Sequence, residues 1–235
     1  MHYALPMSDW ELIWASEHAV LVRARDSSLR AVDSRWISKQ LREIVGSAIR
    51  CVIPSSQGVL IQLDITQLAA SEAAALLASA LDHIEPPEEE SLTDLITIPA
   101  CYDPALAPDL EPVAQQLGLE VQTLIEMHAH REYQVEALGF SPGFGYLRSL
   151  DDRLRLPRRD EPRTRIPPGS IAIAEDMTAV YPSESAGGWH LIARTPLRMF
   201  DAQHCPPGML RVGDRVRFLP IGLDSFKEQE EGAKR

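Results

Sequence analysis

The residues best suited to chemistry lie between His128 and Phe200. Arg163 and Arg165 are two positions apart, so in an extended segment both side chains point to the same side. Two guanidinium groups on one face form a fork that matches the oxygens of a carboxylate or a phosphate. The alternative is a solvated basic face whose arginines pair weakly with nearby acidic side chains. The same stretch is rich in arginine throughout, at positions Arg153, Arg155, Arg158, Arg159, Arg163 and Arg165.

A second candidate is the segment from Leu138 to Leu147, which interleaves aromatic residues with glycine and proline. Such a segment can line a pocket, because glycine lets backbone amides approach a ligand closely. The alternative is a tight turn whose aromatic side chains belong to the core. The chain contains no GxxxxGK[ST] loop and no GxGxxG after a strand, so the segment is not a nucleotide-binding loop of either type.

Histidine and serine offer weaker signals. His128 and His130 close a predicted helix but do not share a face, and a zinc pair would need i, i+4 spacing or further ligands. The pKa of a histidine lies near neutrality, so His128 could act as a general base or contact a substrate. A purely structural role, as a histidine favoured by the dipole at the end of a helix, accounts for its position equally well. Ser170 follows a glycine without a GxSxG elbow, so its hydroxyl is a candidate for binding rather than attack. His190 stands beside Trp189 and is a further candidate.

The elements that must position these residues begin with an alternating N-terminal region. The hydrophobic pattern predicts a helix that starts at Asp33 or Ser34 and a Pro- and Glu-rich linker at 85–90. Strands are expected at 11–15, 19–24, 49–53, 59–63 and 95–98, and a second helix at 71–81. This order indicates a ferredoxin-like βαββαβ layer, a sheet with helices on one face.

Beyond residue 100 the pattern changes. Helices are expected at 109–117 and 121–129, followed from Tyr133 by short strands and frequent turn residues, with strands at 171–173, 179–181, 190–193 and 215–218. Short, closely spaced strands are typical of a barrel or a sandwich. The charged residues 226–235 predict a solvated, mobile tail.

Composition limits the function. Of 235 residues, 45% are hydrophobic and 24% are charged, as in an ordinary globular protein. Lys and Arg total 23 against 34 Asp and Glu, a net charge of −11 that disfavours nucleic acid as a partner. Cys51, Cys101 and Cys205 lack CxxC spacing, which argues against a disulfide framework or a zinc site. No signal peptide and no apolar run of about 18 residues is visible, so we expect a soluble, cytoplasmic protein without membrane contact.

Several linked motifs resemble the allophanate hydrolase subunit 1 family, which is also known as the B-type 5-oxoprolinase component (PxpB, KipI-like). Their order and spacing agree over roughly residues 95–220. The motifs are Gly139-Phe140-x-Pro142-Gly143-Phe144-x-Tyr146-Leu147, Pro162-Arg163, Pro168-Gly169-Ser170, Tyr181-Pro182, Gly187-Gly188-Trp189 and Arg194-Thr195-Pro196.

The resemblance implies an α+β protein: an N-terminal α/β domain over 1–92, a cyclophilin-like β-barrel over 93–225 and the tail at 226–235. It implies a hydrolase subunit that opens the 5-oxoproline lactam to glutamate at the expense of ATP. The partners would be a subunit 2 or C-type protein and an A-type (LamB/YcsF-like) subunit, and the chain would be inactive without them. ATP with Mg would bind at a subunit interface, with no metal site in this chain.

The resemblance also assigns roles. His128 and Arg163 are the candidate catalytic residues, and Phe140, Pro142, Gly143 and Phe144 form the pocket loop. Candidate substrate-binding residues are Arg165, Ser170, Tyr181, Trp189, His190 and Arg194. Glu175 and Met177 lie where relatives often carry Gly and Gln, Asp176 adds a second acidic residue between them, and His190 replaces a glutamine, so the substrate could differ from 5-oxoproline. Alternatives are a KipI-like inhibitor of a sensor histidine kinase, a carboxyltransferase-type subunit for another amide or urea and, from the barrel alone, a prolyl isomerase.

Overall fold

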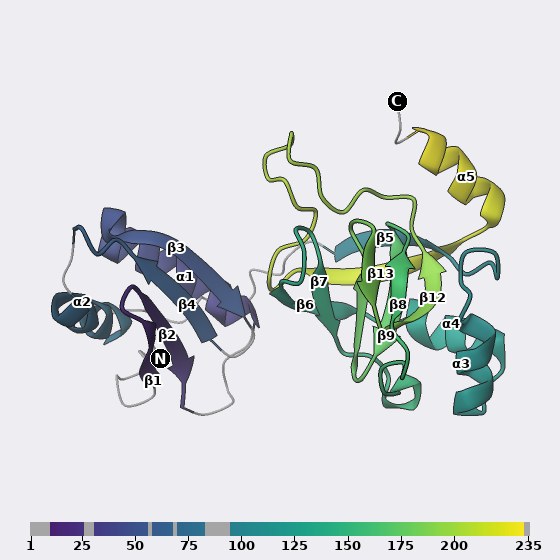
Figure 1. The fold of residues 1–235 in the computed structure, drawn as a ribbon, viewed down its shortest axis with the longest axis horizontal. Coiled ribbons are helices and arrows are strands. Elements are labelled where there is room, and N and C mark those ends of the chain that lie inside the picture. The colour runs from purple at the N-terminus through teal and green to yellow at the C-terminus, as the bar shows by residue number, and fades with distance from the viewer. Residues whose placement is uncertain (1–9, 26–30, 56–57, 68–69, 83–94, 233–235) are drawn as a thin grey trace. The chain divides into compact units, whose positions relative to one another are not determined.

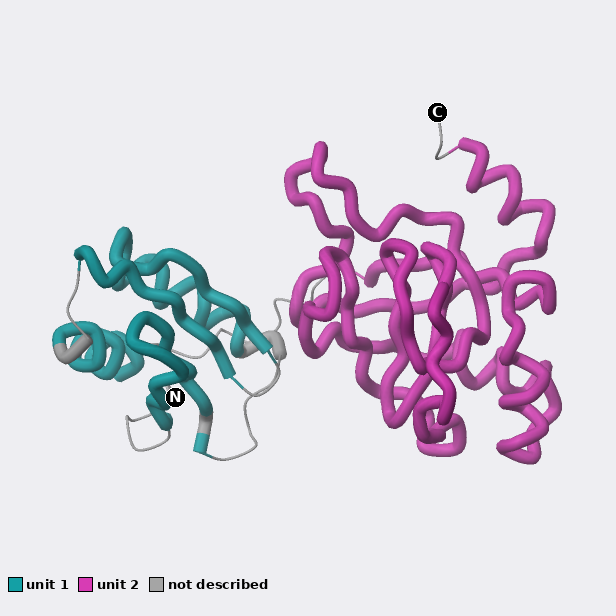
Figure 2. Tube along the Cα trace, in the orientation of Figure 1, with its two compact units in different colours: residues 1–93 teal, residues 94–235 magenta. Residues whose placement is uncertain are grey.

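The protein divides into two compact units, residues 1–93 and 94–235 (Figure 2). The structure, a computed structural model, describes residues 10–25, 31–55, 58–67, 70–82 and 95–232. The linker expected at 85–90 and the N-terminal residues 1–9 lie outside the described residues. No helix in the described ranges is long and apolar enough to cross a membrane.

The first unit is a four-stranded antiparallel sheet with two helices (Figure 1). In chain order its elements are β1 (Trp10–Ser16), β2 (Ala19–Ala24), α1 (Ala31–Val45), the 3-10 helix η2 (Gly46–Ala48), β3 (Ile49–Ser55), β4 (Gly58–Leu63) and α2 (Ala70–Asp82). The sheet order is β1-β2-β4-β3. Alternate residues of β4, Val59, Ile61 and Leu63, share one core with Leu41 of α1 and Leu77 of α2, so both helices cover the same sheet face.

The strand at 95–98 does not close this layer, although the sequence pattern predicted that it would. It forms β5 (Leu95–Cys101) of the second unit, where it pairs in parallel with β13 (Arg215–Ile221) and antiparallel with β12 (His190–Arg194). The first unit therefore has the order ββαββα. The mixed α+β class and the C-terminal barrel are confirmed.

The second unit is built on a closed barrel in the order β10-β7-β6-β13-β5-β12-β9. Its remaining elements are α3 (Leu110–Leu117), α4 (Val121–Ala129), β6 (Tyr133–Leu138), β7 (Gly145–Arg148), η3 (Asp152–Leu154), β8 (Arg163–Ile166), β9 (Ser170–Ala174), β10 (Met177–Val180), β11 (Ser185–Gly187) and α5 (Leu223–Gly232). β8 and β11 form a separate two-stranded sheet. The β13–β5 pair is parallel and the other barrel pairs are antiparallel.

Strand β9 is buried on both faces and separates two cores. Ile171 and Ile173 join the main core, which includes residues of α3 and α4. Ala172 and Ala174 face the opposite way, because side chains alternate along a strand, and join an outer cluster with Phe144, Tyr181 and Trp189. The small alanines leave room for these large rings.

The tail expected at 226–235 is helical in its described part, and residues 233–235 lie outside the described residues. Residues 223–232 form helix α5, and Phe226 is its buried residue. Phe226 contacts the guanidinium of Arg194, which also lies 3.5 Å from Glu230, so a buried ring and an ion pair both join the helix to the barrel unit.

Candidate functional site

Arg163 and Arg165 do not form a common fork. Arg163 donates from Nη1 to Oδ2 of Asp109 at 2.8 Å and from Nη2 to Oδ1 at 2.7 Å. Arg165 donates from Nε to Glu184 Oε2 at 2.7 Å. The Arg163 side chain is 24% exposed and that of Arg165 is 78% exposed. The ion-pair alternative therefore describes both residues in this structure, with one pair largely buried and one on the surface.

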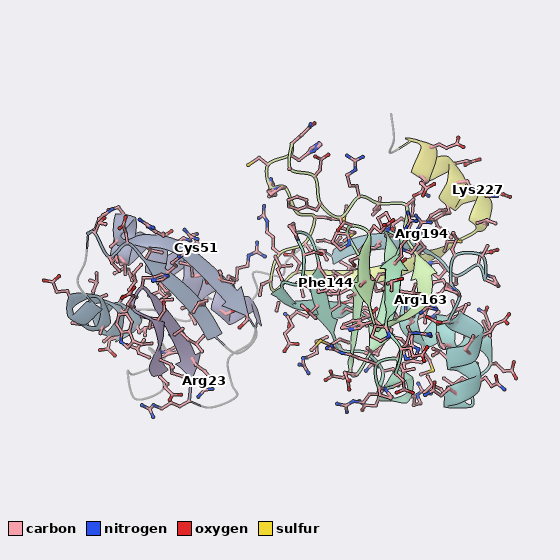
Figure 3. All side chains as sticks on the ribbon, viewed as in Figure 1. Arg23, Cys51, Phe144, Arg163, Arg194 and Lys227 are labelled. Atoms are coloured by element: carbon pink, nitrogen blue, oxygen red, sulfur yellow. The ribbon has the colours of Figure 1, made fainter. Side chains whose placement is uncertain are left out.

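Asp109 is the centre of the buried network. Its carboxylate also accepts from the backbone N–H of Leu191 at 2.7 Å and from Arg159 Nη1 at 3.1 Å. Asp109 thereby ties the start of α3 to β12, to β8 and to the segment that precedes β8. Figure 3 labels Arg163, the partner of Asp109 in β8. The sequence pattern placed Asp109 only at the beginning of a helix. Its arginine partners lie 50 and 54 positions away, so no local pattern could identify them.

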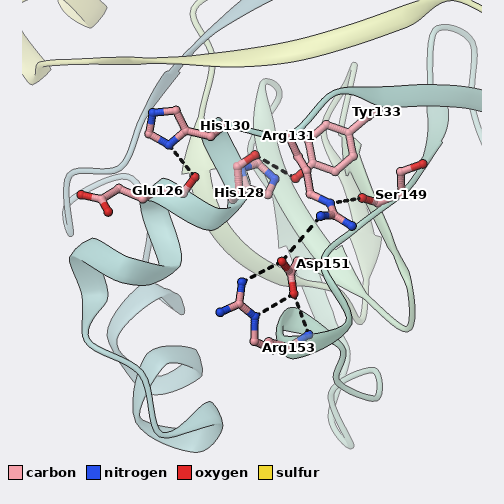
Figure 4. A network of polar contacts seen from close by, with 8 residues as sticks. All are labelled: Glu126, His128, His130, Arg131, Tyr133, Ser149, Asp151 and Arg153. Atoms are coloured by element: carbon pink, nitrogen blue, oxygen red, sulfur yellow. Dashed lines mark hydrogen bonds and ion pairs between the residues drawn. The ribbon is translucent and has the colours of Figure 1, made fainter.

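His128 lies in the core and not at a surface where a substrate could reach it. Tyr102 Oη is 2.7 Å from its Nδ1, Thr178 Oγ1 is 3.0 Å from its Nε2, and its ring stacks on Phe218. Tyr133 Oη donates to the His128 carbonyl at 2.8 Å (Figure 4). Burial lowers the pKa of His128 from 6.5 to about 3, so the imidazole is neutral near pH 7. This geometry contradicts the expected substrate contact and makes His128 a core residue.

The expected pocket loop is a tight turn between β6 and β7. Gly139 N–H donates to the Phe144 carbonyl at 3.2 Å, and Phe144 N–H donates to the Ser141 carbonyl at 3.0 Å. Gly143 has φ +84, and a Cβ there would lie 2.6 Å from Phe200 Cβ, so the turn requires glycine on two counts. Pro142, which precedes Gly143 in this turn, is exposed.

The two phenylalanines of this turn have different environments. Phe144 is buried in the outer cluster, whereas Phe140 is 60% exposed and has φ +65, an uncommon conformation for a bulky residue. The Phe140 ring still contacts Phe144 edge-on, with centroids 5.1 Å apart. The core interpretation thus holds for Phe144, and Phe140 presents an aromatic edge at the surface.

Tyr181 and Trp189 are mainly packing residues. Tyr181 is buried beside Phe144, with ring centroids 5.3 Å apart, and Trp189 packs against the same ring at 6.0 Å. Burial raises the pKa of Tyr181, while a hydrogen bond from the Trp189 backbone and the positive charges of Arg158 and Arg163 oppose that shift. The hydroxyl of Tyr181 therefore lies near the arginine network.

Three other candidates make structural hydrogen bonds. Ser170 Oγ donates to the Pro167 carbonyl at 2.8 Å, and His190 Nε2 donates to the Pro157 carbonyl at 3.0 Å. Arg194 Nε donates to the Pro168 carbonyl at 3.0 Å, and its guanidinium lies over the ring of Phe226 in α5. These contacts fix loops around the barrel. They leave His190 at the rim of a hollow.

That hollow has a volume of about 410 Å³ and lies beside the arginine network. It is lined by Gln116, Pro157, Arg158, Arg159, Asp160, Glu161 and His190. Of the site residues predicted from the sequence, only His190 lines this hollow. The local excess of arginine in the sequence was the signal that pointed to Arg158 and Arg159. Within the described ranges no group of three or more His, Cys, Asp or Glu side chains is placed to hold a metal ion.

Solved structures share this architecture. The crystal structure of TTHA0988 superposes with a TM-score of 0.74 at 31% identity, covering 86% of this chain and 40% of that one. The urea amidolyase of K. lactis superposes with a TM-score of 0.71 at 17% identity, covering 95% of this chain and 16% of the amidolyase. The protein is thus of the α+β barrel class that forms one segment of these longer chains.

The family follows from the sequence match. The chain belongs to the family described as carboxyltransferase domain, subdomain C and D, whose model matches residues 10–210. It is 42% identical over 137 residues to the B-type subunit of 5-oxoprolinase from Bacillus subtilis (strain 168). That match covers 58% of this chain and 57% of the relative, so it spans little more than half of the curated protein.

Proposed function

We propose that the protein is a subunit of an ATP-dependent 5-oxoprolinase in the cytoplasm, acting with a C-type and an A-type subunit. The observation that supports this most directly is the 42% identity to a protein named as the B-type subunit of 5-oxoprolinase. The barrel unit contributes a fixed aromatic turn and a polar hollow beside a buried arginine network.

In the proposed reaction, the lactam oxygen takes the terminal phosphoryl group of Mg-bound ATP and ADP leaves. Water then adds to the activated carbonyl carbon, and the C–N bond breaks to give an acyl phosphate. A second water releases phosphate from it and leaves glutamate. A resonance-stabilised amide is a poor electrophile, and phosphorylation of its oxygen makes the carbonyl carbon more reactive. We assign the ATP contacts to an interface between subunits. Because His128 is buried and neutral, we propose no proton transfer by this residue.

Arg163 acts in this proposal as a positioning residue. Its guanidinium is held by Asp109 at two points, so it supports the segment that carries Arg158 and Arg159 rather than binding the substrate itself. Arg165, which pairs with Glu184, and Phe140 are both exposed, so a partner protein or the substrate can reach them at the surface.

The test is co-expression with the C-type and A-type proteins, followed by an assay of ATP-dependent glutamate release from 5-oxoproline. We expect turnover that requires all three proteins. A stable complex that turns over another lactam, amide or urea, but not 5-oxoproline, would refute the proposed substrate. Absence of any complex would refute the subunit assignment.

A further inference from the structure

The hollow beside β8 contains charges that the fold itself does not use. The side chains of Arg158, Asp160 and Glu161 line it and form no hydrogen bond or ion pair with any described residue. Every other arginine between residues 148 and 198 lies within 4.0 Å of a carboxylate. In a region where arginines are otherwise paired, Arg158 is available to a ligand.

Arg159 adds a second unsatisfied donor. Its Nη1 binds Asp109, but its Nε is buried without a hydrogen-bond partner in the described structure. A buried donor left unpaired costs about 1–3 kcal/mol. Asp109 is already bound at two points by Arg163, which leaves one positive charge in excess in the group of Asp109, Arg159 and Arg163.

The wall of the hollow is held in place before any ligand arrives. Arg159 N–H donates to the Gly188 carbonyl at 2.8 Å, and His190 holds the Pro157 carbonyl. Asp109 anchors the same segment through Arg159 from within. A fixed wall lowers the ordering cost of binding, because fewer side chains and backbone bonds lose freedom.

We propose that this hollow binds an α-amino acid in its zwitterionic form. A guanidinium from Arg158 suits a carboxylate, and the carboxylates of Asp160 and Glu161 suit an ammonium group. Arg158 and the two carboxylates line the same hollow without forming an ion pair, so the guanidinium nitrogens lie more than 4.0 Å from the carboxylate oxygens. A small molecule that carries both an ammonium and a carboxylate satisfies both. A volume of about 410 Å³ is ample for it.

The choice of glutamate as the probe rests on the proposed function, since glutamate would be the product of lactam opening. The site therefore distinguishes product from substrate by chemistry. 5-Oxoproline has a carboxylate but its nitrogen is an uncharged amide, so it cannot use Asp160 or Glu161 as glutamate does.

Isothermal titration calorimetry on the full chain tests the inference with L-glutamate, glutarate and 5-oxoproline. We expect saturable binding of glutamate, and binding at least tenfold weaker for the other two compounds, which lack the ammonium group. Arg158→Ala should weaken glutamate binding at least tenfold. Glu161→Gln should weaken glutamate but leave glutarate unchanged. Arg153→Ala is the matched control, because Arg153 is an exposed arginine outside the hollow that pairs with Asp151.

No saturable binding of glutamate, or equal binding by Arg158→Ala and the unaltered chain, would overturn the site. If glutarate bound as tightly as glutamate, the proposed recognition of an ammonium group would be refuted, and the hollow would be a site for a simple anion. Failure of this site can be told apart from failure of the proposed function. Turnover by the assembled enzyme without glutamate binding to this chain would refute only the proposed binding site. Glutamate binding without turnover supports the hollow and refutes the enzyme assignment.

Discussion

Arg163 and Asp109 face each other across 54 positions of sequence and are joined by two parallel hydrogen bonds of 2.8 and 2.7 Å. Asp109 precedes α3 and Arg163 opens β8, so one ion pair fixes a helix against the small sheet outside the barrel. The same carboxylate accepts from the Leu191 backbone. The arginine that the sequence offers as an anion binder is thus first a part of the fold.

Replacement of Arg163 should therefore reduce stability. Arg163→Ala leaves the buried Asp109 carboxylate with one arginine, and removal of one partner from a buried pair typically costs about 3–5 kcal/mol. We expect the free energy of unfolding of the barrel unit, measured in urea, to fall by about 3 kcal/mol. Arg165→Ala, which breaks the exposed pair with Glu184, should change it little. Equal effects of the two substitutions would contradict the structural role of Arg163.

His128 should make the barrel unit sensitive to acid. Its pKa falls from 6.5 in the unfolded chain to about 3 in the folded protein, because burial disfavours the charged ring. The unfolded state therefore binds a proton below pH 6.5 that the folded state does not accept. The contribution of His128 to the free energy of unfolding is fully present above pH 6.5. It is lost as the pH falls from 6.5 to about 3, by about 1.4 kcal/mol for each pH unit.

His128→Gln tests this dependence, since an amide can bond to Tyr102 and Thr178 without titrating. The variant should lose less stability than the unaltered protein as the pH falls from 6.5 to 4. Gln203→Ala, at an exposed residue that does not titrate, should keep the original slope. Asp151, with a pKa lowered to about 2 chiefly by its hydrogen bonds to Arg153, contributes stability that is lost only at lower pH. Parallel slopes for all three proteins would contradict the assignment.

The sequence predicts local elements well and long-range partners poorly. Period-2 and period-3.6 patterns are local, so helices at 121–129 and strands at 19–24 fall where they were expected. β5 was assigned to the wrong layer because its parallel partner is β13, which pairs Leu95 with the distant Arg215. The local sequence at 95–98 predicts a strand but does not indicate the sheet to which that strand belongs.

The candidate site shows the same limit. The histidine at the end of α4 has the sequence signs of an exposed helix end, but Tyr102 and Thr178 come from distant segments and enclose it. Arg163 and Arg165 stand two positions apart on one strand, the spacing that predicted a common face, yet Arg163 pairs with Asp109 and Arg165 with Glu184. The arginine-rich composition did indicate the region of the hollow. Which arginines remain unpaired depends on carboxylates that only folding brings near.

Gly143 should tolerate substitution less well than Gly118, although both have positive φ. Gly118, at φ +67 after α3, has open space where a Cβ would lie, so Gly118→Ala should cost only the backbone strain of about 1–2 kcal/mol. Gly143→Ala adds a clash with Phe200 and the Met199 carbonyl, and overpacking costs about 1–3 kcal/mol more. Thermal unfolding of the two variants measures the difference. Equal losses would show that the turn moves to accommodate the methyl group.

Helix α5 should detach when its buried residue, Phe226, is removed. Phe226 is 3% exposed and supports the guanidinium of Arg194, which also lies 3.5 Å from Glu230. Phe226→Ala removes the buried ring, and a short, charged helix has little stability of its own. We expect backbone amides at 223–232 to exchange with solvent much faster, while β9 and β12 stay protected.

Lys227→Ala is the matched control, because it alters an exposed neighbour in the same helix and leaves the ring in place (Figure 3). Its exchange rates should equal those of the unaltered chain. If Phe226→Ala also exposed the barrel strands, the helix would be part of the barrel's cooperative unit. If exchange at 223–232 were unchanged, the ion pair between Arg194 and Glu230 would be sufficient to hold the helix without Phe226.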